Sequence, residues 1–139
     1  MGVILVVDDE QSSREILSNF LEGAGYDVVR ASDGQEALDL LQKHEVRAIV
    51  TDLRMPNVNG LRLIRALREN GDTIPILAVS GINRDQLMLA EDYGANVGLS
   101  KPVDRDELIR IMKQVLSDSR DDWSGVWIHP EFGLSLIHI

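Results

Sequence analysis

Four apolar runs in this sequence each end at a polar residue of the kind that carries chemistry. The runs occupy residues 3–7, 48–51, 76–79 and 97–100, and they are followed by Asp8-Asp9, Asp52, Ser80 and Lys101. Continuous apolar runs of this length are typical of strands in a parallel sheet that is buried on both faces. Because ligands of such open sheets bind outside the carboxyl ends of the strands, we expect these polar residues to meet at one edge. Three carboxylates, a hydroxyl and an ammonium at that edge suit a divalent metal and a phosphoryl group.

The intervals between the apolar runs carry helix signals. Capping-box patterns or close variants begin at Ser12, Asp33, Asn83 and Asp104, and a further helix is expected after Gly60. Apolar residues at helical spacing follow these positions, and we interpret them as faces that pack on the core. Five strand–helix alternations with short links indicate right-handed crossovers. The sequence therefore predicts an α/β fold, a doubly wound five-stranded parallel sheet flanked by five helices.

Composition and charge narrow the classes of function. A chain of 139 residues has room for one domain with a core and a short extension. It has no cysteine, which excludes a disulfide framework and fits a reducing cytoplasm. The first apolar run is far too short to span a membrane. A net charge of −9 argues against direct nucleic-acid binding, which depends on Lys and Arg. We therefore expect a cytoplasmic protein that contacts neither membrane nor nucleic acid.

The order of these residues resembles the receiver domain of bacterial two-component response regulators, the CheY-like domains. The resemblance rests on Asp8-Asp9, Asp52, the stretch Met55-Pro56 to Gly60, Ser80 and Lys101-Pro102, and it covers roughly residues 3–117. It implies a flavodoxin-like strand order, 2-1-3-4-5. It also implies a receiver (phosphoacceptor) domain over residues 1–117, followed by a C-terminal extension or linker remnant over residues 118–139.

The resemblance also implies the chemistry of the site. Asp52 would accept a phosphoryl group from a sensor histidine kinase or a phosphotransfer protein, in a reaction that depends on Mg²⁺. Asp9 and Asp52 would bind the Mg²⁺ directly, Asp8 would bind it through water, and the backbone carbonyl of Arg54 would supply another ligand. Such a domain is not an enzyme, because it catalyses only its own phosphorylation and slow autodephosphorylation, and it signals by conformational change.

The resemblance implies that two further residues contact the phosphoryl oxygens. Lys101 would do so with its charge and Ser80 with a hydrogen bond. The bond between Lys101 and Pro102 is expected to be cis, as is typical of the family. The sequence departs from the family at Gly98, where a Tyr or Phe ring usually moves on activation. Either the backbone after Ser80 shifts instead, or Tyr93 or another residue substitutes, or the domain is a phosphorelay carrier without switch output.

Another class of protein uses similar residues. Aspartyl-phosphate phosphatases of the haloacid dehalogenase kind also combine a strand-end Asp, Mg²⁺ and a Lys. Their nucleophile normally lies on the first strand in an Asp-x-Asp arrangement, whereas Asp8 and Asp9 are adjacent. The chain is also too short for the usual cap of that group. This function is therefore the alternative to a receiver.

The segment from residue 118 to 139 begins polar and then turns apolar, and it holds both tryptophans of the chain. Residues 126–128 and 134–139 are predicted as short strands. The segment is the stub of a truncated effector domain, a cloning remnant, or an arm that docks on the receiver or on a second subunit. Because an exposed strand edge invites pairing with another chain, we expect a homodimer formed through this extension.

Overall fold

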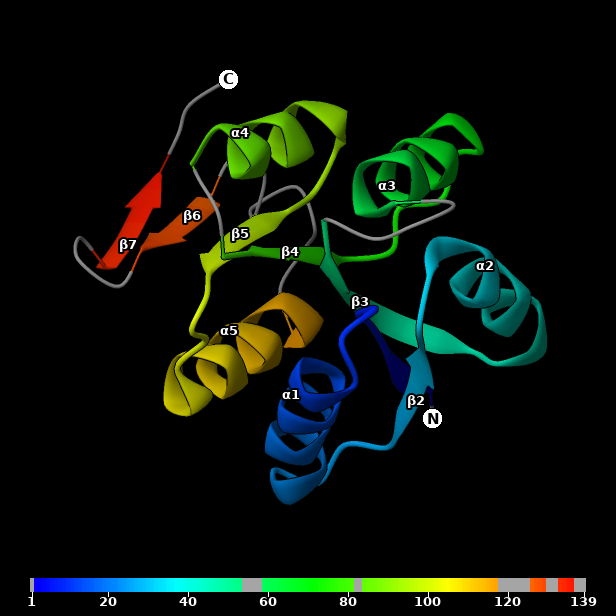
Figure 1. Cartoon of the computed structure of the whole chain (residues 1–139), viewed down its shortest axis with the longest axis horizontal. Coiled ribbons are helices and arrows are strands. Elements are labelled where there is room, and N and C mark those ends of the chain that lie inside the picture. The colour runs from blue at the N-terminus through cyan, green and yellow to red at the C-terminus, as the bar shows by residue number, and fades with distance from the viewer. Residues whose placement is uncertain (1, 54–58, 82–83, 118–125, 130–132, 137–139) are drawn as a thin grey trace.

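The computed structural model describes residues 2–53, 59–81, 84–117, 126–129 and 133–136; for residues 84–86, 126–129 and 133–136 it defines the backbone. The elements are β1 (Val3–Val7), α1 (Gln11–Gly23), β2 (Val28–Ala31), α2 (Gly34–Lys43), β3 (Val46–Asp52), α3 (Gly60–Glu69), β4 (Ile76–Ser80), α4 (Arg84–Tyr93), β5 (Val97–Ser100), α5 (Arg105–Ser117), β6 (Val126–His129) and β7 (Gly133–Leu136). The first five strands are parallel and lie in the order β2-β1-β3-β4-β5, as predicted. Figure 1 shows α1 and α5 on one face of this sheet and α2, α3 and α4 on the other.

The two faces of the sheet carry separate apolar cores. Successive side chains of a strand point to opposite faces, so Ile4 and Val6 pack toward α1 and α5, while Leu5 and Val7 pack toward α2, α3 and α4. Both sets are almost completely buried. Because the sheet is buried on both faces, its strands consist of continuous apolar residues. The same burial holds the strand ends, and therefore the residues that follow them, in fixed positions.

Two of the four predicted helix caps are present. The side chain of Asp33 accepts a hydrogen bond from the Glu36 backbone N–H at 2.8 Å, and Asp104 caps α5 in the same way. The cap predicted at Ser12 is wrong: α1 begins at Gln11, and its N-cap residue makes no side-chain cap bond. The chain enters the helix one residue after the acidic pair, with Glu10 at the N-cap, and this leaves the serines inside the first turn. The predicted cap at Asn83 lies outside the described residues.

The C-terminal extension forms two strands, as predicted, and they enlarge the sheet. Strand β6 pairs in parallel with β5, with Gly98 opposite Trp127, and β7 pairs antiparallel with β6. The described sheet therefore has seven strands in place of the predicted five. The sequence pattern gave the strand character but no pairing partner for these short segments. In this arrangement β6 covers the edge of β5 within one chain, and a homodimer through the extension stays a prediction.

Among the described residues, every helix is too short or too polar to cross a bilayer.

Candidate functional site

The polar residues that end four strands meet at one edge of the sheet. Asp8 follows β1, Asp52 ends β3, Ser80 ends β4, and Lys101 follows β5. Asp8, Asp52 and Ser80 are 0%, 7% and 4% exposed, whereas Asp9 is exposed. The ends of β4 and β5 are also joined through the backbone, because the Lys101 N–H donates to the carbonyl of Ser80 at 3.0 Å. The predicted convergence of these residues is therefore present in the structure.

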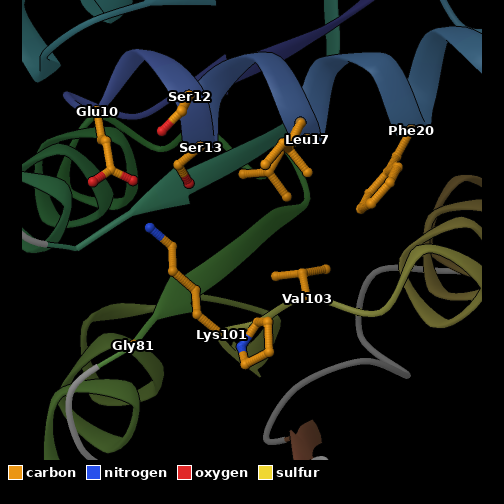
Figure 2. A pocket seen from close by; sticks show the side chains of 10 residues that line it. Glu10, Ser12, Ser13, Leu17, Phe20, Gly81, Lys101 and Val103 are labelled. Atoms are coloured by element: carbon orange, nitrogen blue, oxygen red, sulfur yellow. The ribbon is translucent and has the colours of Figure 1, made fainter.

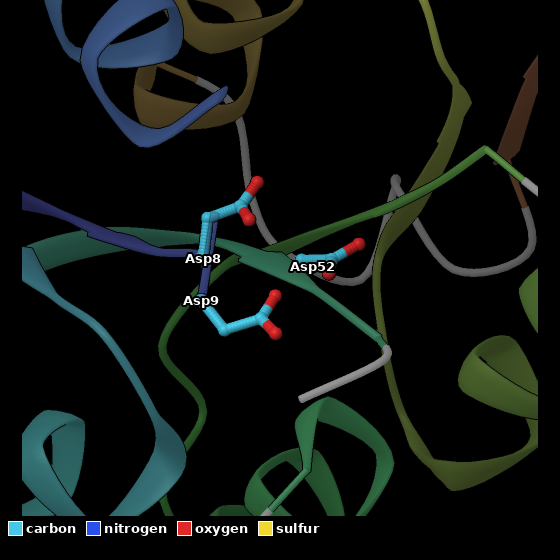
Figure 3. A group of neighbouring side chains, drawn as sticks. All are labelled: Asp8, Asp9 and Asp52. Atoms are coloured by element: carbon cyan, nitrogen blue, oxygen red, sulfur yellow. The ribbon is translucent and has the colours of Figure 1, made fainter. Parts of the chain in front are cut away.

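Three carboxylates form the acidic part of this edge. Ligand oxygens of Asp8, Asp9 and Asp52 all lie within 4.8 Å of one another (Figure 3). Mg²⁺ prefers hard oxygen ligands such as carboxylates and usually keeps several water molecules. The exposed side chain of Asp9 leaves room for such water. Carboxylates this close also repel one another unless a cation lies among them. The residues present therefore fit a divalent cation.

Lys101 supplies the positive charge of the site. Its ammonium nitrogen lies 3.2 Å from Oδ2 of Asp8 and 3.5 Å from Oδ1 of Asp52. Burial alone would lower the pKa of Lys101, but the carboxylates of Asp52 and Asp8 outweigh it and raise the pKa. Lys101 therefore stays charged at neutral pH, and its one charge is shared between two carboxylates.

Asp52 is the carboxyl whose titration is most altered. Burial, which disfavours the charged form, is the largest cause, and it raises the pKa of Asp52 from 3.8 to about 6. The ammonium of Lys101 acts in the opposite direction, and the charges of Asp8 and Asp9 add to the rise. At neutral pH the Asp52 side chain is thus a carboxylate, and its surroundings compensate its negative charge only in part. A further cation would stabilise it.

Asp8 is fully buried and has several hydrogen-bond donors around it. Its Oδ1 accepts from the Glu10 N–H at 3.0 Å, and its Oδ2 accepts from the Ser13 hydroxyl at 2.6 Å. The Arg14 guanidinium donates to the backbone carbonyl of Asp8 at 2.8 Å. Sequence reasoning missed Ser13 and Arg14, because a serine in the first turn of a helix reads as a cap. Their position one turn beyond the acidic pair is the signal that could have revealed them.

The loops around the site match the sequence in part. The bond between Lys101 and Pro102 is cis, as predicted. A Cβ added to Gly60 would overlap the carbonyl oxygen of Asp52, so only glycine lets α3 begin against the end of β3. The expected metal ligand Arg54 lies outside the described residues, as do Met55 and Pro56. Tyr93, a candidate substitute for the missing ring, ends α4 and is half-buried against the core, with its ring 5.9 Å from the Arg65 guanidinium.

A doubly wound α/β sheet with an acidic cluster and a lysine at its strand ends defines a domain of the receiver class. Residues 4–113 match the model of the response regulator receiver domain. The response regulator MprA of Mycolicibacterium vanbaalenii is 40% identical over 126 residues, which are 88% of this chain and 54% of that protein. The CAI-1 autoinducer sensor kinase/phosphatase CqsS of Vibrio cholerae is 42% identical over 110 residues, 76% of this chain and 16% of that protein.

A solved structure gives the same result. The chemotaxis protein CheY4 of Vibrio cholerae superimposes with a TM-score of 0.75 at 33% identity, covering 84% of this chain and 99% of that one. The chain therefore belongs to the response regulator receiver domain family. It spans about half the length of the MprA proteins that it matches.

Proposed function

We propose that this domain accepts a phosphoryl group on Asp52 from the phosphohistidine of a sensor histidine kinase or phosphotransfer protein, in a reaction that depends on Mg²⁺. The observation that supports this most directly is the placement of the buried Asp52 carboxylate. It lies within 4.8 Å of two further carboxylates and 3.5 Å from the Lys101 ammonium. A cation and a phosphoryl group would each meet opposite charge there.

The reaction exchanges one bond to phosphorus for another. An oxygen of Asp52 attacks the phosphorus, the bond between phosphorus and the imidazole nitrogen breaks, and the electron pair stays on that nitrogen. Lys101 places its ammonium against the phosphoryl oxygens, and Ser80 donates a hydrogen bond to one of them. Bound Mg²⁺ would supply the charge neutralisation between the Asp52 carboxylate and the incoming phosphoryl group. Asp8 and Asp9, with Asp52, would hold that ion.

The ionised form of Asp52 is the nucleophile, and the pKa of about 6 leaves that form dominant at neutral pH. Its incomplete compensation by Lys101 is useful to the reaction, because a carboxylate held by strong hydrogen bonds would be a weaker nucleophile. Bound Mg²⁺ would stabilise the carboxylate and lower this pKa, so we expect phosphorylation at saturating Mg²⁺ to slow only below about pH 6, whereas Mg²⁺ binding should weaken as the pH falls through about 6.

We propose further that the domain turns over no external substrate and acts as a cytoplasmic signalling module without direct contact to nucleic acid. Membership of the receiver family favours this over the phosphatase alternative. A generic aryl phosphate distinguishes the two, since a phosphatase would hydrolyse it with many turnovers and a receiver would not.

Intact mass spectrometry after incubation with phosphoramidate or acetyl phosphate tests the phosphoacceptor. The wild type should gain one phosphoryl group with Mg²⁺ and none with EDTA, and Asp52→Asn should gain none. Asp106→Asn, which changes an exposed acid at the start of α5, is the matched control and should react like the wild type. Full labelling of Asp52→Ala, or labelling in EDTA, would disprove the proposal.

A further inference from the structure

Ser13 contacts the site but has no part in the reaction described above. It lies in the first turn of α1, and its hydroxyl donates a hydrogen bond of 2.6 Å to Oδ2 of Asp8. The ammonium of Lys101 lies 3.2 Å from the same oxygen. Figure 2 shows Ser13 and Lys101 facing each other across a groove between α1 and the β5–α5 connection. Two donors on different elements therefore share one carboxylate oxygen.

The distances show which donor holds the better position. A hydroxyl that donates to a carboxylate usually lies about 2.5–2.7 Å away, and an ammonium about 2.7–2.9 Å away. The Ser13 contact falls inside its range, whereas the Lys101 contact, at 3.2 Å, is longer than its range. Ser13 is therefore the closer and better placed of the two donors that share Oδ2 of Asp8.

The position of Lys101 between Asp8 and Asp52 is sensitive to the contact that Ser13 makes with Asp8. Its ammonium lies only 0.3 Å closer to Asp8 than to Asp52, by the difference between 3.2 Å and 3.5 Å. Without the hydroxyl, the Asp8 oxygen would be open for a shorter contact with Lys101. The ammonium would then move toward Asp8 and away from Asp52, where the phosphoryl group is expected.

Ser13 also fixes the orientation of Asp8. The Glu10 N–H holds Oδ1 and the Ser13 hydroxyl holds Oδ2, so the carboxylate is bonded at both oxygens. The helix does not need the hydroxyl as a cap, because its bond goes to a side chain before the helix and not to a backbone N–H. The contact is therefore directed at the site.

We propose that Ser13 is a positioning residue, whose hydroxyl holds Asp8 in its orientation and keeps Lys101 shared between Asp8 and Asp52. The inference rests on the proposed function, since the value of this arrangement is the transfer of a phosphoryl group to Asp52. Partners of this kind, one step removed from a metal or reacting group, typically change metal affinity or activity by about 10–100-fold when removed.

Three variants test the role of the hydroxyl. Ser13→Ala removes it, Ser13→Thr keeps it and places a methyl group next to a groove of about 510 Å³, and Ser12→Ala is the matched control. Ser12 lies one residue earlier, is exposed and lines the same groove. We expect Ser13→Ala to weaken Mg²⁺ binding by calorimetry about tenfold and to slow phosphorylation at saturating Mg²⁺ by a similar factor. In Ser13→Thr and Ser12→Ala, the Mg²⁺ affinity and the phosphorylation rate should stay within about threefold of the wild type, well below the effect expected for Ser13→Ala.

Nuclear magnetic resonance supplies a readout that a loss of helix stability alone would not produce. The amide of Glu10, which is bonded to Asp8, and the ammonium nitrogen of Lys101 should both shift in Ser13→Ala and stay in place in Ser12→Ala. Thermal unfolding checks that each variant folds. If Ser13→Ala does not fold, Ser13→Cys, which keeps the size and weakens the donor, carries the same expectation.

Wild-type Mg²⁺ affinity and rate in Ser13→Ala would overturn the inference, and so would an equal loss in Ser13→Thr. Failure of the proposed function looks different, because the wild type itself would then gain no phosphoryl group. In that case the Mg²⁺ titration and the Glu10 and Lys101 signals still decide whether Ser13 positions Asp8.

Discussion

Replacing Asp52 with Asn should stabilise the metal-free protein at neutral pH. Burial raises the pKa of Asp52 from 3.8 to about 6, so the folded state binds this proton more tightly than the unfolded state. A raised pKa contributes stability that is fully present below pH 3.8 and is lost as the pH rises through about 6. At about 1.4 kcal/mol for each pKa unit, ionisation of Asp52 costs the folded state roughly 2–3 kcal/mol above pH 7. An amide of the same shape avoids this cost.

Urea unfolding in EDTA measures the effect. Asp52→Asn should exceed the wild type in free energy of unfolding by roughly 2–3 kcal/mol at pH 7.5, and the gap should narrow steadily toward pH 4. Mg²⁺ should stabilise the wild type more than the variant, because the ion compensates the same charge. Asp106→Asn, at an exposed position, should show neither effect. An Asp52→Asn protein no more stable than the wild type at pH 7.5, or a gap that does not change with pH, would refute the reasoning.

Three further predictions concern other parts of the chain. The buried hydroxyl of Ser18 has no hydrogen-bond partner among the described residues, so Ser18→Ala should raise the free energy of unfolding by about 1 kcal/mol in a urea titration. A chain that ends at Ser117 should stay folded and accept phosphate; light scattering should show it as a monomer and the full chain as a dimer, and equal masses would contradict the expected homodimer. Beryllofluoride should shift the NMR signals of the backbone after Ser80 and of α4, and burial of the Tyr93 ring on activation would contradict that expectation.

The residues of the site could be predicted from the sequence because of the way parallel sheets are built. The end of each apolar run can be seen in the sequence. The residue that follows it could therefore be assigned to the end of a strand without knowledge of any contact. The parallel arrangement then brought Asp8, Asp52, Ser80 and Lys101 to one edge. The acidic cluster followed from this placement and needed no prediction of side-chain geometry.

The contacts within the site could not be predicted in the same way. Ser13 precedes the apolar face of α1, and its position one turn beyond the acidic pair fits a helix cap as well as a donor to Asp8. The division of one ammonium between Asp8 and Asp52 depends on differences of tenths of an ångström. The two C-terminal strands show the same limit, since their composition gave strand character and only the structure gave β5 as the partner.

The position of Gly98 connects the site to the way in which the domain can signal. Gly98 lies inside β5, opposite Ala78 on one side and Trp127 on the other, and it has no side chain that could turn. The ends of the two neighbouring strands are instead joined by the hydrogen bond from the Lys101 N–H to the Ser80 carbonyl. Both residues are expected to contact the phosphoryl group, so a shift of either one changes the backbone of β4 and β5 together. A phosphoryl group that contacts both residues would therefore have a route to the backbone of β4 and β5 that needs no aromatic ring.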